Sequence, residues 1–281
     1  MKDTTAKIIS NKEIAPGYFK MAIDALYIAE NVLPGQFVEI RCSDGLDPFL
    51  RRPFSIHRVT PAYRQGRGNG LRVTGIEILY EVIGKGTQIL SQKKKGDLLN
   101  VLGPLGNGFT LPDPRNPLHV TPILIAGGIG VAPIMYLAEI LISRKIKPIV
   151  ILGARSREFV LCDKDLKKLG AKVHIATDDG TMGFKGFVTE LFKDFLLATC
   201  SLQLATVYSC GPNPMLKVIV DICKKHDIES QVSLEEKMAC GIGACLGCAV
   251  KIKENRKIVY KLTCKDGPVF CGNNIVWEEQ Y

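Results

Sequence analysis

Residues 123–144 read ILIAGGIGVAPIMYLAEILISR. An apolar run of strand length ends in a glycine-rich turn, and a helical pattern begins directly after it. Between residues 148 and 226, three more apolar runs are each followed by a helical pattern. This alternation predicts a parallel α/β sheet, in which ligands bind at the carboxyl ends of the strands.

The chain on either side of this stretch follows other patterns. Up to about residue 110, short segments such as QFVEIRC and GIEILYEVI alternate apolar and polar residues between Pro, Gly and Asp turns. Such closely spaced strands predict an antiparallel barrel or sandwich. Near the C-terminus, glycines and cysteines precede two strand patterns joined by the polar turn ENRK. We therefore expect a multidomain α+β protein with an antiparallel β-barrel over residues 1–112, a parallel α/β domain over 113–232 and a small cysteine module over 233–281.

Composition narrows the class of protein. The chain has 281 residues, 46% of them hydrophobic, which suffices for two or three domains with their own cores. Its ten cysteines do not indicate a disulfide framework, because disulfide-dense chains are usually short domains. The first residues are polar, and no stretch reaches the roughly 20 apolar residues of a membrane span. We expect a soluble, cytoplasmic protein with reduced thiols and no membrane contact.

The net charge of the chain is +9, from 37 Lys and Arg against 28 Asp and Glu. The basic residues are dispersed, and the one dense run, Lys93–Lys95, has the composition of a solvated turn. We therefore expect no nucleic-acid partner. A mild positive charge suits anionic cofactors or an acidic partner surface.

Four cysteines of the C-terminal module have a distinctive spacing. Cys240, Cys245 and Cys248 form C-x4-C-x2-C, and Cys264 follows after fifteen intervening residues. This is the plant-type spacing for the ligands of a [2Fe–2S] cluster. Structural zinc is the alternative, but zinc sites usually show two short Cys pairs, and only Cys245 and Cys248 form one here.

Glycines beside these cysteines support the cluster interpretation. Gly241, Gly243 and Gly247 permit a tightly curled backbone and leave no side chain against an inorganic anion. Backbone N–H groups of such a loop can then point at the sulfur atoms. Cys271 lies nearby, and we expect it to take no part.

The segment Arg52–Ile56, RPFSI, has the residues to bind a flavin nucleotide. A forked guanidinium can grip a pyrophosphate, an aromatic ring can stack on a flat ring, and a serine hydroxyl can bond a ring nitrogen. A plain core strand is the alternative. Gly84–Thr87, before a short helical pattern, offers free N–H groups to phosphate, or is a simple turn capped by Thr87.

Turns after three of the α/β strands are candidate dinucleotide contacts. The glycines of AGGIG, Gly127, Gly128 and Gly130, allow a tight turn and close approach of a ligand, although the turn lacks the full GxGxxG pattern. Cys210, Gly211 and Pro212 end another strand, where a thiol either borders a nicotinamide or is simply buried before a turn.

The acidic pair Asp178 and Asp179 ends a third strand. Carboxylates at this place hydrogen-bond ribose hydroxyls and repel a 2′-phosphate, which favours NAD over NADP; a solvated acidic turn is the alternative. Arg155 and Arg157 also lie within reach of a ribose, so both nucleotides stay open at this point.

Taken in order, these motifs resemble the ferredoxin–NADP reductase superfamily. More closely, they resemble its family of electron-transfer subunits of two-component, NAD-dependent (type B) dihydroorotate dehydrogenases. The last two motifs are the most specific. The segments that carry the resemblance are RPFSI at 52–56, LYEVIGKGT at 79–87, GPLGNGF at 103–109, AGGIGVAP at 126–133, SCGPNPML at 209–216, EEKMACGIGACLGC at 235–248 and CKDGPVF at 264–270.

The resemblance implies FAD, a [2Fe–2S] cluster and NAD as cofactors. It implies that Ser55 tunes the flavin and that Cys210 borders the nicotinamide. The family usually has a basic residue at the position of Glu81; either Glu81 contributes only its backbone to FAD, or the flavin binds less tightly. The implied FAD contacts are Arg52, Gly86 and Thr87 for the pyrophosphate and Phe54, Ser55, Leu79 and Tyr80 for the ring, with Pro53 and Glu81 also in the binding segments; the implied cluster ligands are Cys240, Cys245, Cys248 and Cys264.

The resemblance also implies a partner and a pathway. The partner is an FMN-containing subunit that oxidises dihydroorotate, expected in a heterotetramer of two subunits of each kind, within pyrimidine (UMP) biosynthesis. Electrons would pass from it through the cluster and FAD to NAD+. The alternatives are another FAD and [2Fe–2S] reductase subunit, serving ferredoxin or a hydrogenase complex, and a zinc-stabilised binding subunit without redox activity.

Overall fold

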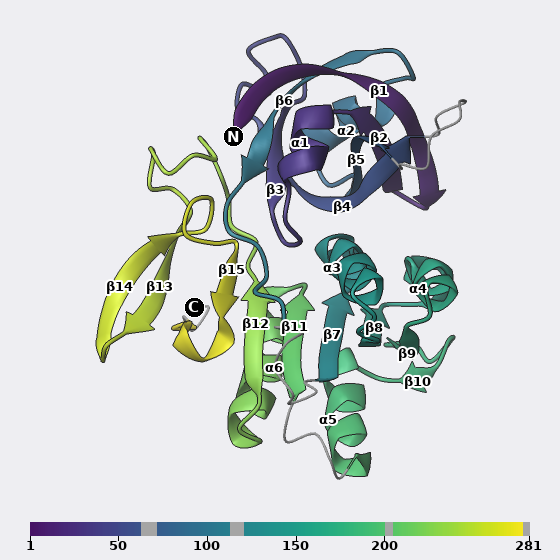
Figure 1. The fold of residues 1–281 in the computed structure, drawn as a ribbon, viewed down its shortest axis with the longest axis vertical. Coiled ribbons are helices and arrows are strands. Elements are labelled where there is room, and N and C mark those ends of the chain that lie inside the picture. The colour runs from purple at the N-terminus through teal and green to yellow at the C-terminus, as the bar shows by residue number, and fades with distance from the viewer. Residues whose placement is uncertain (63–71, 113–120, 200–204, 278–281) are drawn as a thin grey trace.

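The structure is a computed structural model and describes residues 1–62, 72–112, 121–199 and 205–277. Figure 1 shows a barrel at the top, an α/β domain below it and the cysteine module beside both. This multidomain arrangement confirms the fold class that the sequence predicts. The expected boundary between the first two domains adjoins residues 113–120, which lie outside the described residues.

The first six strands close into an antiparallel barrel. Strict alternation on β6 turns Leu99 and Val101 into the core and their neighbours outward. Two short helices, α1 (Leu26–Asn31) and α2 (Lys85–Gln92), add their own buried side chains to the same core. In order around the barrel the strands are β1 (Lys2–Ala15), β2 (Tyr18–Asp24), β5 (Arg72–Glu81), β4 (Arg52–Ala62), β3 (Phe37–Arg41) and β6 (Leu98–Leu105).

A seven-stranded sheet forms the centre of the second domain. Its first six strands pair in parallel, as the strand–helix alternation predicts. The seventh comes from the cysteine module and pairs antiparallel. In order across the sheet the strands are β10 (Phe184–Lys185), β9 (Lys172–Thr177), β8 (Ile149–Ala154), β7 (Thr121–Gly127), β11 (Ala205–Cys210), β12 (Glu229–Ser233) and β15 (Val269–Cys271).

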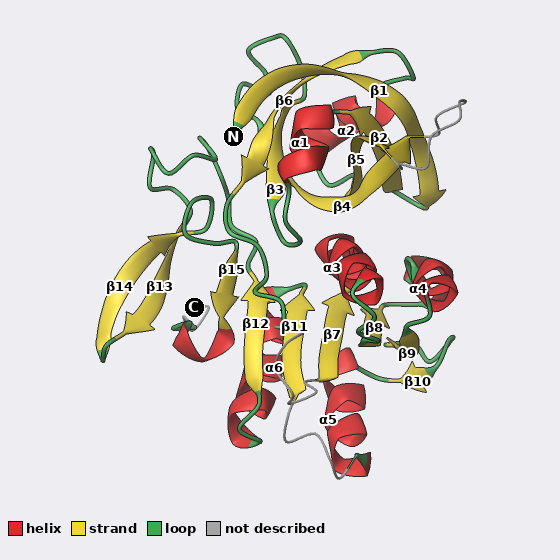
Figure 2. Ribbon diagram, in the orientation of Figure 1, coloured by secondary structure: helices red, strands yellow, loops and turns green. Residues whose placement is uncertain are grey.

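Helices cover both faces of this sheet (Figure 2). On β7, Leu124 packs with α3 (Val131–Ser143) and α4 (Asp163–Leu169), whereas Ile123 packs with α5 (Val188–Ala198) and α6 (Asn213–Lys225). Successive residues of a strand point to opposite faces, so β7 is apolar throughout. Three short 3-10 helices, at Gly128–Gly130, Arg157–Phe159 and Gly272–Asn274, complete the described helices.

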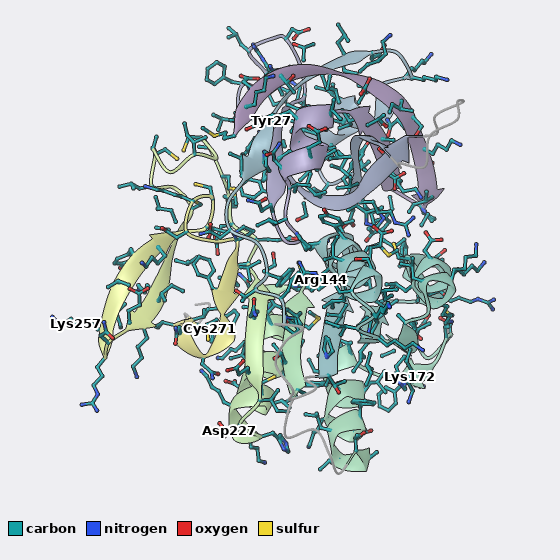
Figure 3. All side chains as sticks on the ribbon, in the orientation of Figure 1. Tyr27, Arg144, Lys172, Asp227, Lys257 and Cys271 are labelled. Atoms are coloured by element: carbon teal, nitrogen blue, oxygen red, sulfur yellow. The ribbon has the colours of Figure 1, made fainter. Side chains whose placement is uncertain are left out.

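The cysteine module is small and shares its core with the α/β domain. Its hairpin, β13 (Ala249–Glu254) and β14 (Lys257–Leu262), turns at Asn255 and Arg256, both with positive φ, as a two-residue hairpin turn requires. Figure 3 labels Lys257 at the outer end of this hairpin. Inward-facing side chains of β13 and β15 pack against α6 and β12. None of the helices in the described part of the chain has the length and apolarity needed to cross a membrane.

Candidate cofactor sites

The loop between β12 and β13 carries three of the four predicted cluster ligands. It turns through positive φ at Gly241 (+70°), Gly243 (+84°) and Leu246 (+59°). The first two are the positions where the sequence analysis required a tightly curled backbone. The loop thereby brings Cys240, Cys245 and Cys248 close to Cys264, which follows β14.

Backbone N–H groups point at the sulfur atoms of this loop. Among the nine cysteines in the described residues, none forms a disulfide, so all four thiols are free to bind a metal group. Cys245 is exposed, whereas Cys248 and Cys264 are buried. The N–H donors are Gly243 to Cys264 Sγ (3.1 Å), Ala244 and Cys245 to Cys240 Sγ (3.3 and 3.4 Å), and Cys264 to Cys248 Sγ (3.4 Å).

These hydrogen bonds give the thiols different acidities. Burial acts to raise the pKa of Cys240, but N–H groups of Ile242, Cys245 and Ala244 outweigh it and lower the pKa to about 6. Burial and the neighbouring Cys248 raise the pKa of Cys264 to about 12. A thiolate is thus already favoured at Cys240, whereas Cys264 needs a metal to lose its proton.

The spacing of the cysteines and the N–H donors around them suit a binuclear cluster. Within the described segments, no group of three or more Cys, His, Asp or Glu side chains is already arranged to hold a metal ion. A structural zinc ion usually has two short Cys pairs as ligands, and only Cys245 and Cys248 form such a pair here. A [2Fe–2S] cluster spreads its four thiolates over two irons, and the N–H donors to sulfur are those it requires.

The proposed pyrophosphate contacts of FAD meet at one edge of the barrel. A Cβ at Gly86 would lie 3.2 Å from Arg52 Cγ, 3.3 Å from Arg52 Nε and 3.3 Å from Cys42 Sγ, so a side chain here would fill the space beside the guanidinium. Within the described residues, Arg52 donates hydrogen bonds to the neighbouring carbonyls of Leu50 and Arg51 alone, which leaves donors available to an anion. Arg52 and Gly86 therefore fit a phosphate-binding cradle.

The aromatic candidates of this site lie inside the barrel. Phe54 and Tyr80 are 7% and 2% exposed, and their rings meet edge to face with centroids 5.7 Å apart. Leu79 is also buried, against the α/β domain, whereas Ser55 and Pro53 keep partial exposure. Stacking of Phe54 or Tyr80 on a flavin thus stays a prediction, with little of either ring at the surface.

Thr87 and Glu81 make local contacts of a different kind. The hydroxyl of Thr87 accepts hydrogen bonds from the N–H groups of Ile83 and Gly84, which is the turn-and-cap alternative of the sequence analysis. The carboxylate of Glu81 accepts a hydrogen bond from the Tyr18 phenol; burial and this negative charge raise the Tyr18 pKa, while Arg155 opposes them. The side chain of Glu81 therefore faces the α/β domain.

The two predicted nicotinamide turns pack directly on each other. A Cβ at Gly130 would lie 2.5 Å from the carbonyl carbon of Cys210 and 2.7 Å from the nitrogen of Gly211. A Cβ at Gly127 would lie 3.2 Å from Pro212 Cδ. The register explains this proximity, because β7 and β11 are paired and end together. These glycines are therefore needed for the contact between the turns.

Gly128 and Cys210 occupy different environments in this site. Gly128 has a φ of +54°, and a Cβ there would meet nothing within 4 Å, so the space above the turn is open to a ligand. Cys210 is fully buried, and burial, then the charge of Glu235, raises its pKa well above the ordinary value. A neutral thiol at the end of β11 is suited to pack against a ring, not to act as a nucleophile.

Sequence reasoning missed a carboxyl at this site, Glu235. It lies two residues after the end of β12; desolvation by the surrounding protein raises its pKa, and the charge of Glu81 adds to the shift. Glu235 thus joins a polar group with Glu81, Tyr18, Arg155 and Cys210 between the two larger domains. The EE pair just before the cysteine loop was the available signal.

The ribose candidates lie on two neighbouring loops after β8 and β9. The N–H groups of Asp178 and Asp179 donate to the carbonyls of Ala154 and Arg155 at 3.0 and 3.2 Å. Thr181 links the loops further: its hydroxyl accepts from the Arg157 N–H at 2.8 Å and donates to Asp179 Oδ1 at 2.7 Å. Both carboxylates and both arginines thus meet at the carboxyl ends of these strands.

A pocket of about 390 Å³ lies next to these loops. Its walls come from both larger domains and include Arg157 and Met182. His57 and Cys162 face each other in it, with Nε2 and Sγ 4.0 Å apart, while His57 Nδ1 donates to the Ala132 carbonyl. Of the nucleotide-contact candidates from the sequence, Arg157 lines this pocket, whereas the predicted FAD and cluster residues do not.

Comparison with known proteins gives matches over nearly the whole chain. A family model described as the iron–sulfur cluster binding domain of dihydroorotate dehydrogenase B matches residues 235–276, and one described as an oxidoreductase NAD-binding domain matches residues 124–221. A ferredoxin NADP+ reductase from Neisseria gonorrhoeae, solved with bound FAD and NADP, shares the fold with a TM-score of 0.66 at 20% identity, over 80% of this chain and 92% of that one. An NADH-dependent reduced ferredoxin–NADP oxidoreductase gives a TM-score of 0.81 at 26% identity, over 97% and 90% of the two chains.

Curated relatives are more similar still. The dihydroorotate dehydrogenase B (NAD(+)) electron transfer subunit of Desulforamulus reducens is 45% identical over 97% of this chain and 98% of its own length. The subunits of the same name from Caldanaerobacter subterraneus and Fusobacterium nucleatum are 38% and 39% identical over 97% and 98% of this chain, and over 98% and 99% of their own lengths. The chain therefore belongs to the family of electron transfer subunits of dihydroorotate dehydrogenase B.

Proposed function

We propose that this protein is the electron-transfer subunit of an NAD-dependent dihydroorotate dehydrogenase of type B, acting in pyrimidine biosynthesis. One observation carries the proposal. The four cysteines lie inside the segment that matches the cluster-binding domain of that enzyme, with N–H donors already directed at the sulfur atoms of Cys240, Cys248 and Cys264. The Glu81 departure is confined to one side chain.

The residues have the following roles. Cys240, Cys245, Cys248 and Cys264 would hold a [2Fe–2S] cluster, Arg52 and Gly86 the pyrophosphate of FAD, and the turns after β7 and β11 NAD. When bound, the cluster exchanges single electrons, a flavin exchanges one or two, and nicotinamide takes up a hydride, so the three suit transfer from a partner's FMN to NAD+.

The chain itself binds, orients and excludes water. Ser55, partly exposed on β4, would donate a hydrogen bond to a flavin ring nitrogen. Cys210, fully buried, would form an apolar wall beside the nicotinamide. No general acid or base of this chain is required for hydride transfer.

We further propose a heterotetramer of two such chains with two FMN-containing catalytic subunits, in the cytoplasm. The name of the relatives, an electron transfer subunit, supports a catalytic partner. The free cysteines among the described residues support a reducing compartment. Asp178 and Asp179 support NAD over NADP.

Another reductase subunit of the same fold is the second candidate. The similarity to an NADH-dependent ferredoxin–NADP oxidoreductase, with a TM-score of 0.81, supports it. The two differ in the electron donor. Dihydroorotate with the FMN subunit, and ferredoxin without it, can be offered separately to the same preparation.

The test uses anaerobically purified protein. About two irons and two sulfides per chain, together with FAD, are expected. With the FMN subunit and dihydroorotate, NADH should form. Cys245→Ser should abolish this formation and leave FAD bound, whereas Cys271→Ser, at an exposed thiol on β15 (Figure 3), should change nothing.

Each outcome that would contradict the proposal points to a particular alternative or step. Dihydroorotate-driven NADH formation that survives Cys245→Ser would refute the electron route. Zinc in place of iron, or protein with neither flavin nor iron, would favour the zinc-stabilised binding subunit. NADH formation from reduced ferredoxin, with no response to dihydroorotate, would favour the second candidate.

A further inference from the structure

The cluster ligands pack against a strand of the barrel as well as against their own module. On β3, Val38 and Ile40 point into the barrel core, so Phe37 and Glu39 point outward. Phe37 is 3% exposed and packs with Leu105 against the buried ligands Cys248 and Cys264. The outward face of β3 is therefore covered by the cysteine module.

Glu39 lies beneath the other end of the cluster loop. A Cβ at Gly241 would lie 2.5 Å from Glu39 Cγ, 2.7 Å from Oε1 and 2.9 Å from Cδ, so the backbone after Cys240 rests directly on this side chain. The φ of +70° at Gly241 reflects the same close approach. Only glycine fits between this turn and Glu39.

Glu39 is a buried carboxyl group, and burying such a group without a hydrogen bond is energetically unfavourable. Its side chain is 0% exposed, and neither carboxyl oxygen has a hydrogen-bond partner within the described residues. A buried polar group without a hydrogen-bond partner destabilises the folded chain. Burial raises the pKa of Glu39 to about 7; Arg51 and Arg52 oppose this shift, and Cys240 adds to it, so the carboxyl lies within electrostatic range of both arginines and of the first ligand.

Along one edge, β3 pairs with the strand β4, which carries predicted flavin-binding residues. In the β3–β4 pairing, Phe37 is opposite Ser55, Glu39 is opposite Pro53 and Ile40 is opposite Arg52. The same five-residue strand therefore contacts the cluster loop with its outward face and is hydrogen-bonded to the RPFS segment along its edge. Of the two described strands that pair with β4, namely β3 and β5, β3 is the one that also contacts the cluster loop.

We propose that Glu39 is a positioning residue for the cluster: by filling the space under Gly241 it fixes the Cys240 end of the loop on the barrel, as Phe37 fixes the Cys248 and Cys264 end. This inference rests on the proposed function, because it requires a cluster in that loop. Groups that orient metal ligands from outside commonly contribute about 10–100-fold to metal retention. Glu39 would act through contact, and its amide analogue should replace it.

The experiment compares four variants of the full chain with wild type. Glu39→Ala empties the space, Glu39→Gln keeps its shape, and Gly241→Ala adds a methyl that needs the same space. Glu77→Ala is the matched control, since Glu77 is a partly buried acid on β5 with an unpaired oxygen, next to Glu139 and not to the cluster loop. Iron release to a chelator, the electron paramagnetic resonance spectrum of the reduced cluster, FAD content and thermal unfolding are measured for each.

We expect Glu39→Ala to release iron about tenfold faster and to alter the resonance spectrum, with FAD content unchanged. Glu39→Gln and Glu77→Ala should behave as wild type. The double variant Glu39→Ala with Gly241→Ala should retain iron better than Gly241→Ala alone, because the methyl then finds the emptied space.

Three results would overturn the inference. The first is wild-type iron release and an unchanged spectrum in Glu39→Ala. The second is a Glu39→Gln variant that behaves as Glu39→Ala, since contact would then not be what matters. The third is a joint loss of iron, FAD and unfolding temperature, as in a general folding defect. Wild-type protein without iron would instead refute the proposed function itself.

Discussion

Substitutions of Gly128 and Gly130, in the turn after β7, test whether this turn binds NAD. Gly130 has an ordinary helical φ of −58°, but its Cβ would lie 2.5 Å and 2.7 Å from backbone atoms of Cys210 and Gly211. These distances are about 1 Å short of ordinary van der Waals contact, and backbone atoms cannot rotate away. Gly130→Ala should therefore push the ends of β7 and β11 apart.

The expected size of the effect follows from that displacement. Overpacking typically costs about 1–3 kcal/mol, and the upper end applies where backbone meets backbone. A shift of about 1 Å among positioning groups can lower a catalytic rate about 100-fold. The methyl added in Gly128→Ala would meet no atom within 4 Å. The substitution should therefore destabilise the protein only because alanine disfavours the left-handed backbone conformation, by about 1 kcal/mol. Its methyl would enter the open space above the turn and raise the KM for NADH.

The assay is NADH oxidation with ferricyanide, which requires no partner subunit. Gly130→Ala should lose turnover and stability, measured by urea unfolding, at unchanged FAD and iron content. Gly128→Ala should keep kcat and stability within about 1 kcal/mol and show a raised KM. Wild-type turnover in Gly130→Ala, or an unchanged KM in Gly128→Ala, would refute the assignment of this turn.

Three other substitutions test single residues. Burial lowers the His57 pKa to about 3, so as the pH falls the unfolded chain takes up a proton before the folded chain does. The free energy of unfolding should therefore decrease below pH 6.5, by about 1.4 kcal/mol per pH unit. His57→Gln should show a flatter dependence in urea unfolding between pH 6.5 and about 5, and parallel profiles of the two proteins would contradict this. Cys210→Ser should lower NADH turnover about tenfold, or about 1.4 kcal/mol, with cofactors retained, and unchanged turnover would remove Cys210 from the nicotinamide site. Arg52→Lys should weaken FAD binding about tenfold in a flavin-release assay, because lysine lacks the forked donors; equal affinity would show that Arg52 does not bind the pyrophosphate.

Local sequence patterns were sufficient to predict the architecture. Period-two alternation gave the barrel strands, and the apolar run before Gly127 followed by a helical pattern gave the parallel sheet, because both signals depend only on neighbouring residues. The hairpin turn at Asn255 and Arg256 was predictable for the same reason. Spacing also sufficed to predict that Cys240, Cys245 and Cys248 lie together, since they share one short loop; their role as cluster ligands stays a prediction.

Contacts between distant segments could not be predicted in this way. Strand periodicity puts Arg52 and Phe54 on one face, but only the closed barrel turns the Phe54 ring into the core against Tyr80. Glu81 and Glu235 are more than 150 positions apart in the chain, and the charge of Glu81 acts on Glu235 only because the barrel docks on the rest of the chain. In the sequence, Glu39 looks like an ordinary polar residue of a half-exposed strand. Only the structure shows that the cysteine module covers it.

The position of the cysteine module explains why such distant contacts matter. Covalently it follows the α/β domain, and β15 and the shared core with α6 attach it there. Its ligands, however, lie on the barrel: Asn107 donates to the carbonyls of Lys265 and Asp266 at 3.3 and 2.9 Å, beside the contact of Phe37 with Cys264. The Cys264 loop therefore cannot leave the barrel without losing these bonds, nor leave the sheet without breaking the β12–β15 pairing. A module held on two sides keeps its ligands at a constant distance from the predicted flavin site, which a flexible tether could not do.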